Sequence, residues 1–172
     1  MDDPGACRRF KATIEVLVRP CLERDLPALE WMGLYTRQRD IIREAFNAQE
    51  RGDALLLLGV SAGFPVGQVW IDFARKRAEG IAYLWAVRTF YPLQGSGIGR
   101  HMMDAAEAAL RERGIVRAEL GVERDNDSAL RFYEKLGWRV VGPLQERFSY
   151  RSDGSEAAIE HLDQWLMAKP IL

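Results

Sequence analysis

The residues whose types and spacing could do chemistry lie in two short motifs. The first is QGSGIG at residues 94–99, where three glycines alternate with other residues just before an amphipathic helical pattern. The second is NDSALRFYEKLG at residues 126–137, which carries Tyr133 inside a short helical pattern. Backbone amides without a neighbouring Cβ can bind an anion at the start of a helix, and a tyrosine hydroxyl can donate a proton.

The glycine motif does not match the two common nucleotide-binding loops. A dinucleotide fingerprint, G-x-G-x-x-G, needs its third glycine at the position that Arg100 occupies, and Gly99 falls one place early. A P-loop needs a lysine after its glycines, and none follows here. Both interpretations fail on their defining residues. Two others stay open on this stretch alone: an anion-binding helix start, or a strand-to-helix turn whose glycines supply positive φ.

Strands and helices alternate around these motifs. Alternating or continuous apolar patterns predict strands at residues 13–20, 81–90, 115–122 and 138–143, and a hairpin over 54–73 whose turn is SAGFP. Helical spacing predicts one or two helices over 23–52 and single helices over 98–114 and 123–137. RKRAEG at 75–80 reads as a charged turn, and residues 155–169 fit either a helix or a final strand. This order is that of a mixed α/β or α+β protein.

Composition limits the classes of function. The chain has 172 residues and a net charge of −1, which gives no footprint for nucleic acid or an anionic membrane. Cys7 and Cys21 have no metal-type spacing, so we expect neither a disulfide scaffold nor a metal site. The acidic start has no secretory pattern, and the longest apolar run, ALLLLGV, is strand-sized. We therefore expect one cytoplasmic domain over residues 1–172, with 1–10 as a loose tail.

The two motifs in this order and separation resemble the GNAT family of N-acetyltransferases. The resemblance runs from about Ile81 to Gly142 and is weaker over the first 70 residues, where only the element order fits. It implies a twisted, mixed sheet of six or seven strands with helices on both faces. It also implies that the strands at 81–90 and 115–122 are parallel and splay apart in a V. The tail is then a strand, an SDGS turn and a strand.

The same resemblance implies acetyl-CoA as the acyl donor and assigns its contacts. Backbone amides of one run would hold the pyrophosphate: Gln94, Gly95, Ser96, Gly97, Ile98, Gly99 and Arg100. The backbone of the preceding strand would contact the pantetheine arm, at Val87, Arg88 and Thr89. Asn126 would contact the pantetheine as well as capping its helix, and Tyr133 would be the general acid toward the departing thiolate.

One family feature is missing. Many members carry a glutamate on the strand before the glycine motif, near the position of Tyr83, and IAYLWAVRT has no carboxylate. Asp72 and Glu79 are the nearest acids in sequence, and each suits a strand edge or a turn as well as a base. A water chain, or an acceptor that arrives deprotonated, is the alternative, so no base is named.

The acceptor side is less defined. The family implies that the region near Trp31, Tyr35 and Arg37 and the loops beyond Gly142 form its walls. Trp85 is a further lining candidate, and for all three aromatic residues a core position is the competing interpretation. His161 is a lone histidine that fits an exposed or structural position.

The implied function is acetyl transfer to a primary amine, with a small molecule as the expected acceptor. Direct attack in a ternary complex follows because Cys7 and Cys21 lie outside both motifs, so no acyl carrier is placed. Two rivals stay open: acetylation of a protein N-terminus or lysine, and a non-catalytic CoA-binding module. The oligomeric state also stays open, with a homodimer as one option.

Overall fold

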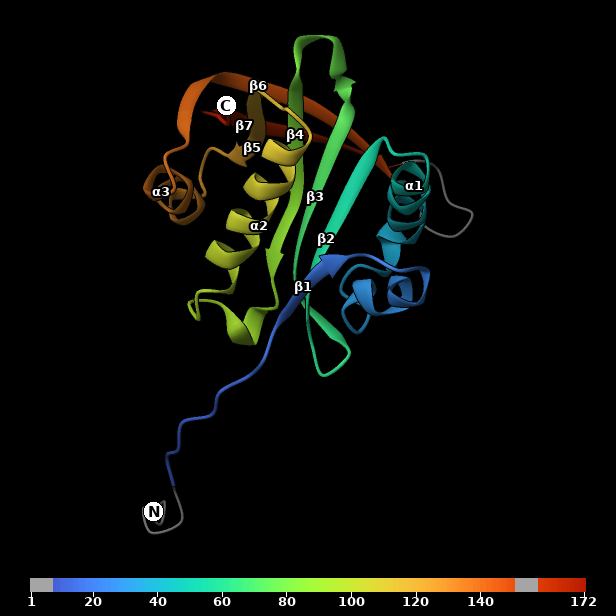
Figure 1. Cartoon of the computed structure of the whole chain (residues 1–172), viewed down its shortest axis with the longest axis vertical. Coiled ribbons are helices and arrows are strands. Elements are labelled where there is room, and N and C mark those ends of the chain that lie inside the picture. Colours follow the sequence, from blue (N-terminus) through green and yellow to red (C-terminus); the bar gives the residue numbers. More distant parts are fainter. Residues whose placement is uncertain (1–7, 151–157) are drawn as a thin grey trace.

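The structure, a computed structural model, describes residues 8–150 and 158–172, and the expected SDGS turn lies outside these ranges. The described strands form one seven-stranded sheet in the order β1-β2-β3-β4-β5-β7-β6 (Figure 1). The pair β4 and β5 is parallel, and the other neighbouring pairs are antiparallel. None of the helices in the described ranges combines the length and apolar character needed to traverse a lipid bilayer.

The N-terminal half departs in detail from the expected elements. Its elements are β1 (Leu17–Pro20), η2 (Glu23–Glu30), η3 (Thr36–Gln38), α1 (Arg39–Glu50), β2 (Ala54–Ser61) and β3 (Phe64–Lys76). Only the second half of the strand expected over 13–20 forms a strand, and the helical region expected over 23–52 is divided into η2, η3 and α1. Pro27 lies inside the 3₁₀ helix η2, and Trp31 and Met32 take positive φ values of 43° and 56°, which ends η2 and turns the chain.

The C-terminal half follows the expected order. Its elements are η4 (Arg77–Glu79), β4 (Ile81–Thr89), η5 (Tyr91–Leu93), α2 (Ile98–Glu112), β5 (Arg117–Glu123), α3 (Asp127–Lys135), β6 (Arg139–Tyr150) and β7 (Ala158–Pro170). The tail is a strand, as the family resemblance implied. Helix propensity in residues 158–162 is overridden because β7 pairs with β5 on one side and β6 on the other.

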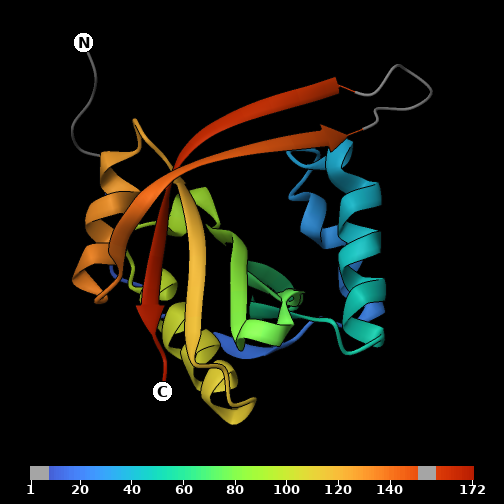
Figure 2. The same ribbon diagram turned by 90° about the horizontal axis from the view of Figure 1, so that it is seen from above.

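Helices cover both faces of the sheet. One apolar cluster joins the sheet to α2 and α3, and includes Leu84, Met102, Leu120 and Tyr133. A second cluster joins the opposite face to η2 and α1, and includes Leu29, Phe46 and Trp70. Figures 1 and 2 show α2 and α1 on opposite sides, with β6 and β7 reaching across toward α1. The two clusters therefore hold the central strands rigidly between them.

The two parallel strands separate in the V that the family resemblance implied. β4 and β5 pair only from Ile81–Arg117 to Leu84–Leu120. Beyond that point β4 stays paired with β3, and β5 stays paired with β7. The register of β4 against β3 also shifts here, and Ala86 takes a φ of 48°, which is the backbone of a bulge. The bulge turns β4 away from β5 and opens the gap.

Candidate active site

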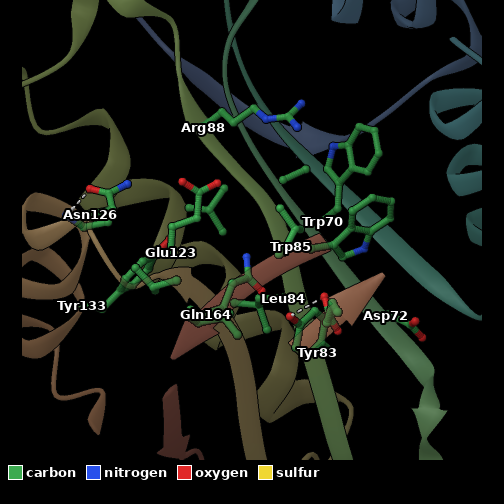
Figure 3. A pocket seen from close by; sticks show the side chains of 18 of the residues that line it. Trp70, Asp72, Tyr83, Leu84, Trp85, Arg88, Glu123, Asn126, Tyr133 and Gln164 are labelled. Carbon is green, nitrogen blue, oxygen red and sulfur yellow. Dashed lines mark hydrogen bonds between the residues drawn. The ribbon is translucent and has the colours of Figure 1, made fainter. Parts of the chain in front are cut away.

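A pocket of about 760 Å³ opens in this gap (Figure 3). Its lining comes from β4 and β5 at and beyond the end of their pairing, from α3 and its cap, and from β3, β6 and β7 on the far side. Gln38, which ends η3, closes one wall. Elements far apart in the chain thus meet around the unpaired edges of two strands.

The glycine loop presents backbone amides beside this gap. Gly95 and Gly97 have φ values of 77° and 92°, which favour glycine, and a Cβ at either would meet nothing within 4 Å. Gly97 begins α2 with no side-chain cap. The described part of the chain offers no acceptor to the amides of a short run: Gly95, Gly97, Ile98, Gly99 and Arg100. These donors at a helix start suit an anionic group.

The remaining members of the loop are used internally. The amides of Gln94 and Ser96 donate to Tyr91 O and Leu93 O. Their side chains also bond within the loop, with Gln94 Nε2 3.4 Å from Thr89 O and Ser96 Oγ 2.5 Å from Leu93 O. Both residues therefore shape the loop.

Gly99 has a packing role. A Cβ there would lie 3.4 Å from Thr89 Oγ1 and 3.5 Å from Phe132 Cζ, so glycine lets α2 approach β4 and α3 closely. Thr89 itself does not line the pocket, whereas its neighbours Val87 and Arg88 do. These two residues lie on the stretch of β4 that β5 leaves unpaired, where the free strand edge suits an extended amide-bearing ligand.

Tyr133 and Asn126 line the pocket from α3. Tyr133 is 8% exposed and packs against Phe132 and Trp138, with ring centroids 5.1 and 6.1 Å away. Burial raises the pKa of Tyr133 above its ordinary value, so the phenol stays protonated. Asn126 Oδ1 accepts from Ala129 N at 3.1 Å and caps α3, so the expected capping role is confirmed.

A carboxylate that the sequence analysis missed lies on the far side of the pocket. Tyr83 donates to Glu146 Oε2 at 3.4 Å, and Arg75 Nη2 bonds Glu146 Oε1 at 2.5 Å. The Arg75 guanidinium also lies 4.4 Å from the centre of the Tyr83 ring. Burial, and then the charge of Glu146, raises the pKa of Tyr83 to about 12. Glu146 comes from β6, and no local motif in the sequence links it to Tyr83.

Of the two acids considered as a base near Tyr83, only one lines the pocket. Asp72 faces Tyr83 across β3 and β4 and lines the pocket, and its Oδ1 accepts from the amides of Ala74 and Arg75. Glu79 lies in the short helix η4 and does not line the pocket. Glu123, at the end of β5, is a further lining carboxylate.

Only some of the residues considered for the acceptor side line the pocket. Trp85 lines the pocket and packs edge-on against Trp70 at 4.8 Å. Trp31 is 4% exposed and donates from Nε1 to Pro65 O at 2.8 Å, so it is a core residue. Tyr35 stacks against Arg88, as described below. Arg37 and His161 are exposed and do not line the pocket.

The described side chains include no cluster of three or more potential ligands for a metal ion. The pocket instead offers backbone donors, one buried phenol and several carboxylates, which suit group transfer between organic substrates.

The comparisons with known proteins agree with this fold. Residues 19–138 match the family model described as the acetyltransferase (GNAT) family, and the chain belongs to that family. It is 34% identical over 89 residues to a mycothiol acetyltransferase of Propionibacterium freudenreichii, and 37% identical over 78 residues to that of Brachybacterium faecium. These matches cover 51% and 45% of this chain but only 28% and 24% of those proteins, so the chain spans about a quarter of their length.

Solved structures share the fold over nearly the whole chain. An N-acetyltransferase from Staphylococcus aureus Mu50 has a TM-score of 0.72 at 14% identity, with 92% of this chain and 99% of that one covered. A putative acetyltransferase from Salmonella typhimurium, solved with acetyl-CoA as its cofactor, has a TM-score of 0.70 at 17% identity, with 91% and 94% covered. At these identities the likeness concerns the fold, and it includes the seven-stranded sheet described above.

Proposed function

We propose that this chain is an acetyl-CoA-dependent N-acetyltransferase that acts on a primary amine. The observation that carries the proposal is the position of the pocket. The pocket lies along the unpaired edge of β4, and Tyr133 is in its wall. Beyond one end are the amides at the start of α2, which have no hydrogen-bond acceptor among the described residues. An extended acyl donor with an anionic pyrophosphate fits that order of partners. Family membership and the structural neighbour solved with acetyl-CoA support the same donor.

The residues divide the reaction between them. The free amides of Gly95, Gly97, Ile98, Gly99 and Arg100 hold the pyrophosphate, and the β4 backbone at Val87 and Arg88 orients the thioester arm with Asn126. The amine nitrogen then attacks the thioester carbonyl carbon, a C–N bond forms and the C–S bond breaks. Tyr133 donates its proton to the departing sulfur. Burial raises the pKa of Tyr133, which already lies above that of a thiol, so the proton transfer is uphill and its effect depends on the position of the hydroxyl beside the sulfur.

The incoming amine must also lose a proton. Tyr83 cannot accept it, because its pKa of about 12 keeps the phenol protonated at neutral pH. Glu146 lines the pocket and is hydrogen-bonded to Tyr83, near whose position many members of the family carry a glutamate. We assign the proton to Glu146, through water, and Tyr83 orients that carboxylate.

Two alternative functions that the sequence left open are both compatible with this pocket. A protein N-terminus or lysine could be the acceptor, and a non-catalytic CoA-binding module would use the same pocket. Tyr133 in the wall favours catalysis over simple binding. A cytoplasmic location, a single domain and a homodimer remain predictions from the sequence.

The direct test is release of free thiol from acetyl-CoA in the presence of a panel of amines, polyamines, amino acids, aminoglycosides and peptides. We expect thiol release that depends on one class of amine, with the acetylated product detected by mass spectrometry. Stabilisation by acetyl-CoA without transfer to any member of the panel would favour the binding module. No thermal stabilisation at millimolar acetyl-CoA would contradict both.

A further inference from the structure

Four side chains gather on the face of the sheet that meets η3 and α1. Gln68 lies opposite Arg88, and Trp70 lies opposite Trp85, in the pairing of β3 with β4. Residues directly opposite each other on antiparallel strands point to the same face, and so do Gln68 and Trp70, which are two positions apart. The bulge at Ala86 lets Trp85 and Arg88 share that face although they are three positions apart. The Arg88 side chain thus points away from α2, to the acceptor side.

Arg88 is held in place without a counter-charge. Its guanidinium lies 4.0 Å from the centre of the Tyr35 ring, and its Nη2 donates to Gln38 Oε1 at 3.3 Å. Within the described ranges no carboxylate pairs with it: Asp72 accepts backbone amides, and Glu146 pairs with Arg75. Burial lowers the pKa of Arg88, yet an arginine stays charged in proteins. A partly buried cation without an anion is costly, so an anionic group would be bound strongly there.

The neighbours of Arg88 carry further unused hydrogen-bonding groups. Trp70 is 2% exposed and lines the pocket, and its Nε1 has no acceptor among the described residues. Gln68 is 1% exposed, and both Nε2 and Oε1 lack partners in the same part of the chain. In Figure 3 the indole nitrogen of Trp70 lies on the side of its ring toward Arg88. A carboxylate has two oxygens, and Trp70 Nε1, which belongs to a lining residue, is a donor for the one that Arg88 leaves free; Gln68 lies beside them but does not line the pocket.

Arg88 and the Tyr83–Glu146 pair lie at different positions along β4. Arg88 lies toward the glycine-loop end, whereas Tyr83, with Glu146 beside it, lies toward the other end. Trp70 and Trp85 lie between them in Figure 3. A molecule that carries both an amine and a carboxylate complements this lining: Arg88 suits its carboxylate, and the lining carboxylates Glu123 and Glu146, the latter shared with Arg75, suit its ammonium group.

We infer that Arg88 binds a carboxylate on the acceptor, so the acceptor class is primary amines that carry a carboxylate, such as amino acids. This inference rests on the proposed acetyltransferase function and names its substrate class. Arg88 then has two roles: its backbone belongs to the donor arm, and its side chain determines acceptor specificity.

The test compares amines in pairs that differ by one carboxylate: phenylalanine with phenethylamine, tryptophan with tryptamine, and lysine with cadaverine. We expect the intact protein to favour the carboxylate member of the preferred pair about ten- to hundredfold in kcat/KM, as one charged hydrogen-bonding contact would give. Arg88→Met should remove that preference by raising KM for the carboxylate member, and Arg88→Lys should keep part of it. Arg43→Met is the control, because Arg43 is an exposed arginine of α1 that pairs with Glu23 of η2. It should change neither the preference for the carboxylate member nor its KM.

The outcomes distinguish failure of the proposed acetyltransferase function from failure of the carboxylate assignment. If no amine is acetylated, or acetyl-CoA does not bind, the proposed function fails. If both members of every accepted pair react equally well, or phosphoethanolamine is preferred to every amino acid, only the carboxylate assignment fails. If Arg88→Met slows all amines equally, Arg88 merely supports Tyr35 and the inference is wrong. Acetyl-CoA affinity, measured for each variant, must stay unchanged for the comparison to support it.

Discussion

Leu84 and Leu120 are the last residues at which the parallel strands β4 and β5 pair, and both are 1% exposed. They form the base of the V, because the pocket opens immediately beyond them. The apolar cluster around α2 fixes this point, so the splay is built into the core. The site is therefore preformed, and its chemistry should respond to single side chains.

Tyr133→Phe removes the proposed proton donor and leaves the packing against Phe132 and Trp138 in place. We expect kcat to fall about 100-fold, the usual scale for general acid catalysis, with acetyl-CoA affinity unchanged. Steady-state kinetics measures the fall in kcat, and calorimetry measures the affinity for acetyl-CoA. Tyr91→Phe, the same change on a tyrosine that is 80% exposed, should have no effect. An unchanged rate for Tyr133→Phe from neutral to alkaline pH would show that Tyr133 is not the general acid.

Gly97→Ala tests the amides at the start of α2. Gly97 and Gly63 both have positive φ, 92° and 78°, and a Cβ at either meets nothing within 4 Å. Both alanine variants should therefore lose about 1–2 kcal/mol of unfolding free energy from backbone strain. Only Gly97→Ala should weaken acetyl-CoA binding, because Gly63 lies in the β2–β3 turn. Equal affinities in the two variants would remove the glycine loop from the donor site.

Glu146→Gln tests the path of the amine proton. If Glu146 accepts that proton, the variant should lose about 100-fold in kcat at neutral pH. The loss should shrink as the pH approaches the pKa of the amine, because more acceptor then arrives deprotonated. Glu112→Gln, an exposed change on α2, is the control. A loss that stays constant with pH would point to a structural role through Arg75.

These sites also show what the sequence could and could not predict. QGSGIG and NDSALRFYEKLG are local motifs, so the helix starts and the strand before them were predictable, and the V between β4 and β5 was expected from the family resemblance that these motifs carry. Glu146 was not, because its approach to Tyr83 depends on how β6 and β7 cross the molecule. Arg88 was predicted for its backbone alone, since no local pattern indicates that the bulge at Ala86 turns its side chain to the acceptor side. Trp31 belongs to the core because its indole is bonded to Pro65.

Asp25 links β1 to η2. Arg19 binds it through two bonds of 2.6 and 2.9 Å, and these hold the pKa of Asp25 below its usual range. Because the folded pKa is lowered, the stabilisation is present above the unfolded value of about 3.9 and is lost as the pH falls through the folded pKa. We expect Asp25→Asn to cost about 1–3 kcal/mol at pH 7, by denaturant unfolding.

The difference between Asp25→Asn and the unsubstituted protein should narrow in acid below about pH 4. Glu23→Gln, which removes an exposed ion pair with Arg43, should cost less than about 1 kcal/mol. A cost for Asp25→Asn that does not change between pH 7 and pH 3 would show that the ion pair is not its source.

The central claim is acetyl transfer from acetyl-CoA to an amine in the pocket between β4 and β5, and one measurement addresses it most directly. The protein is incubated with acetyl-CoA and an amine panel, and free thiol and acetylated amine are quantified together. We expect one amide to form for each thiol released, and Tyr133→Phe to form both about 100-fold more slowly. Thiol release without an amide, or equal rates for the two proteins, would contradict it.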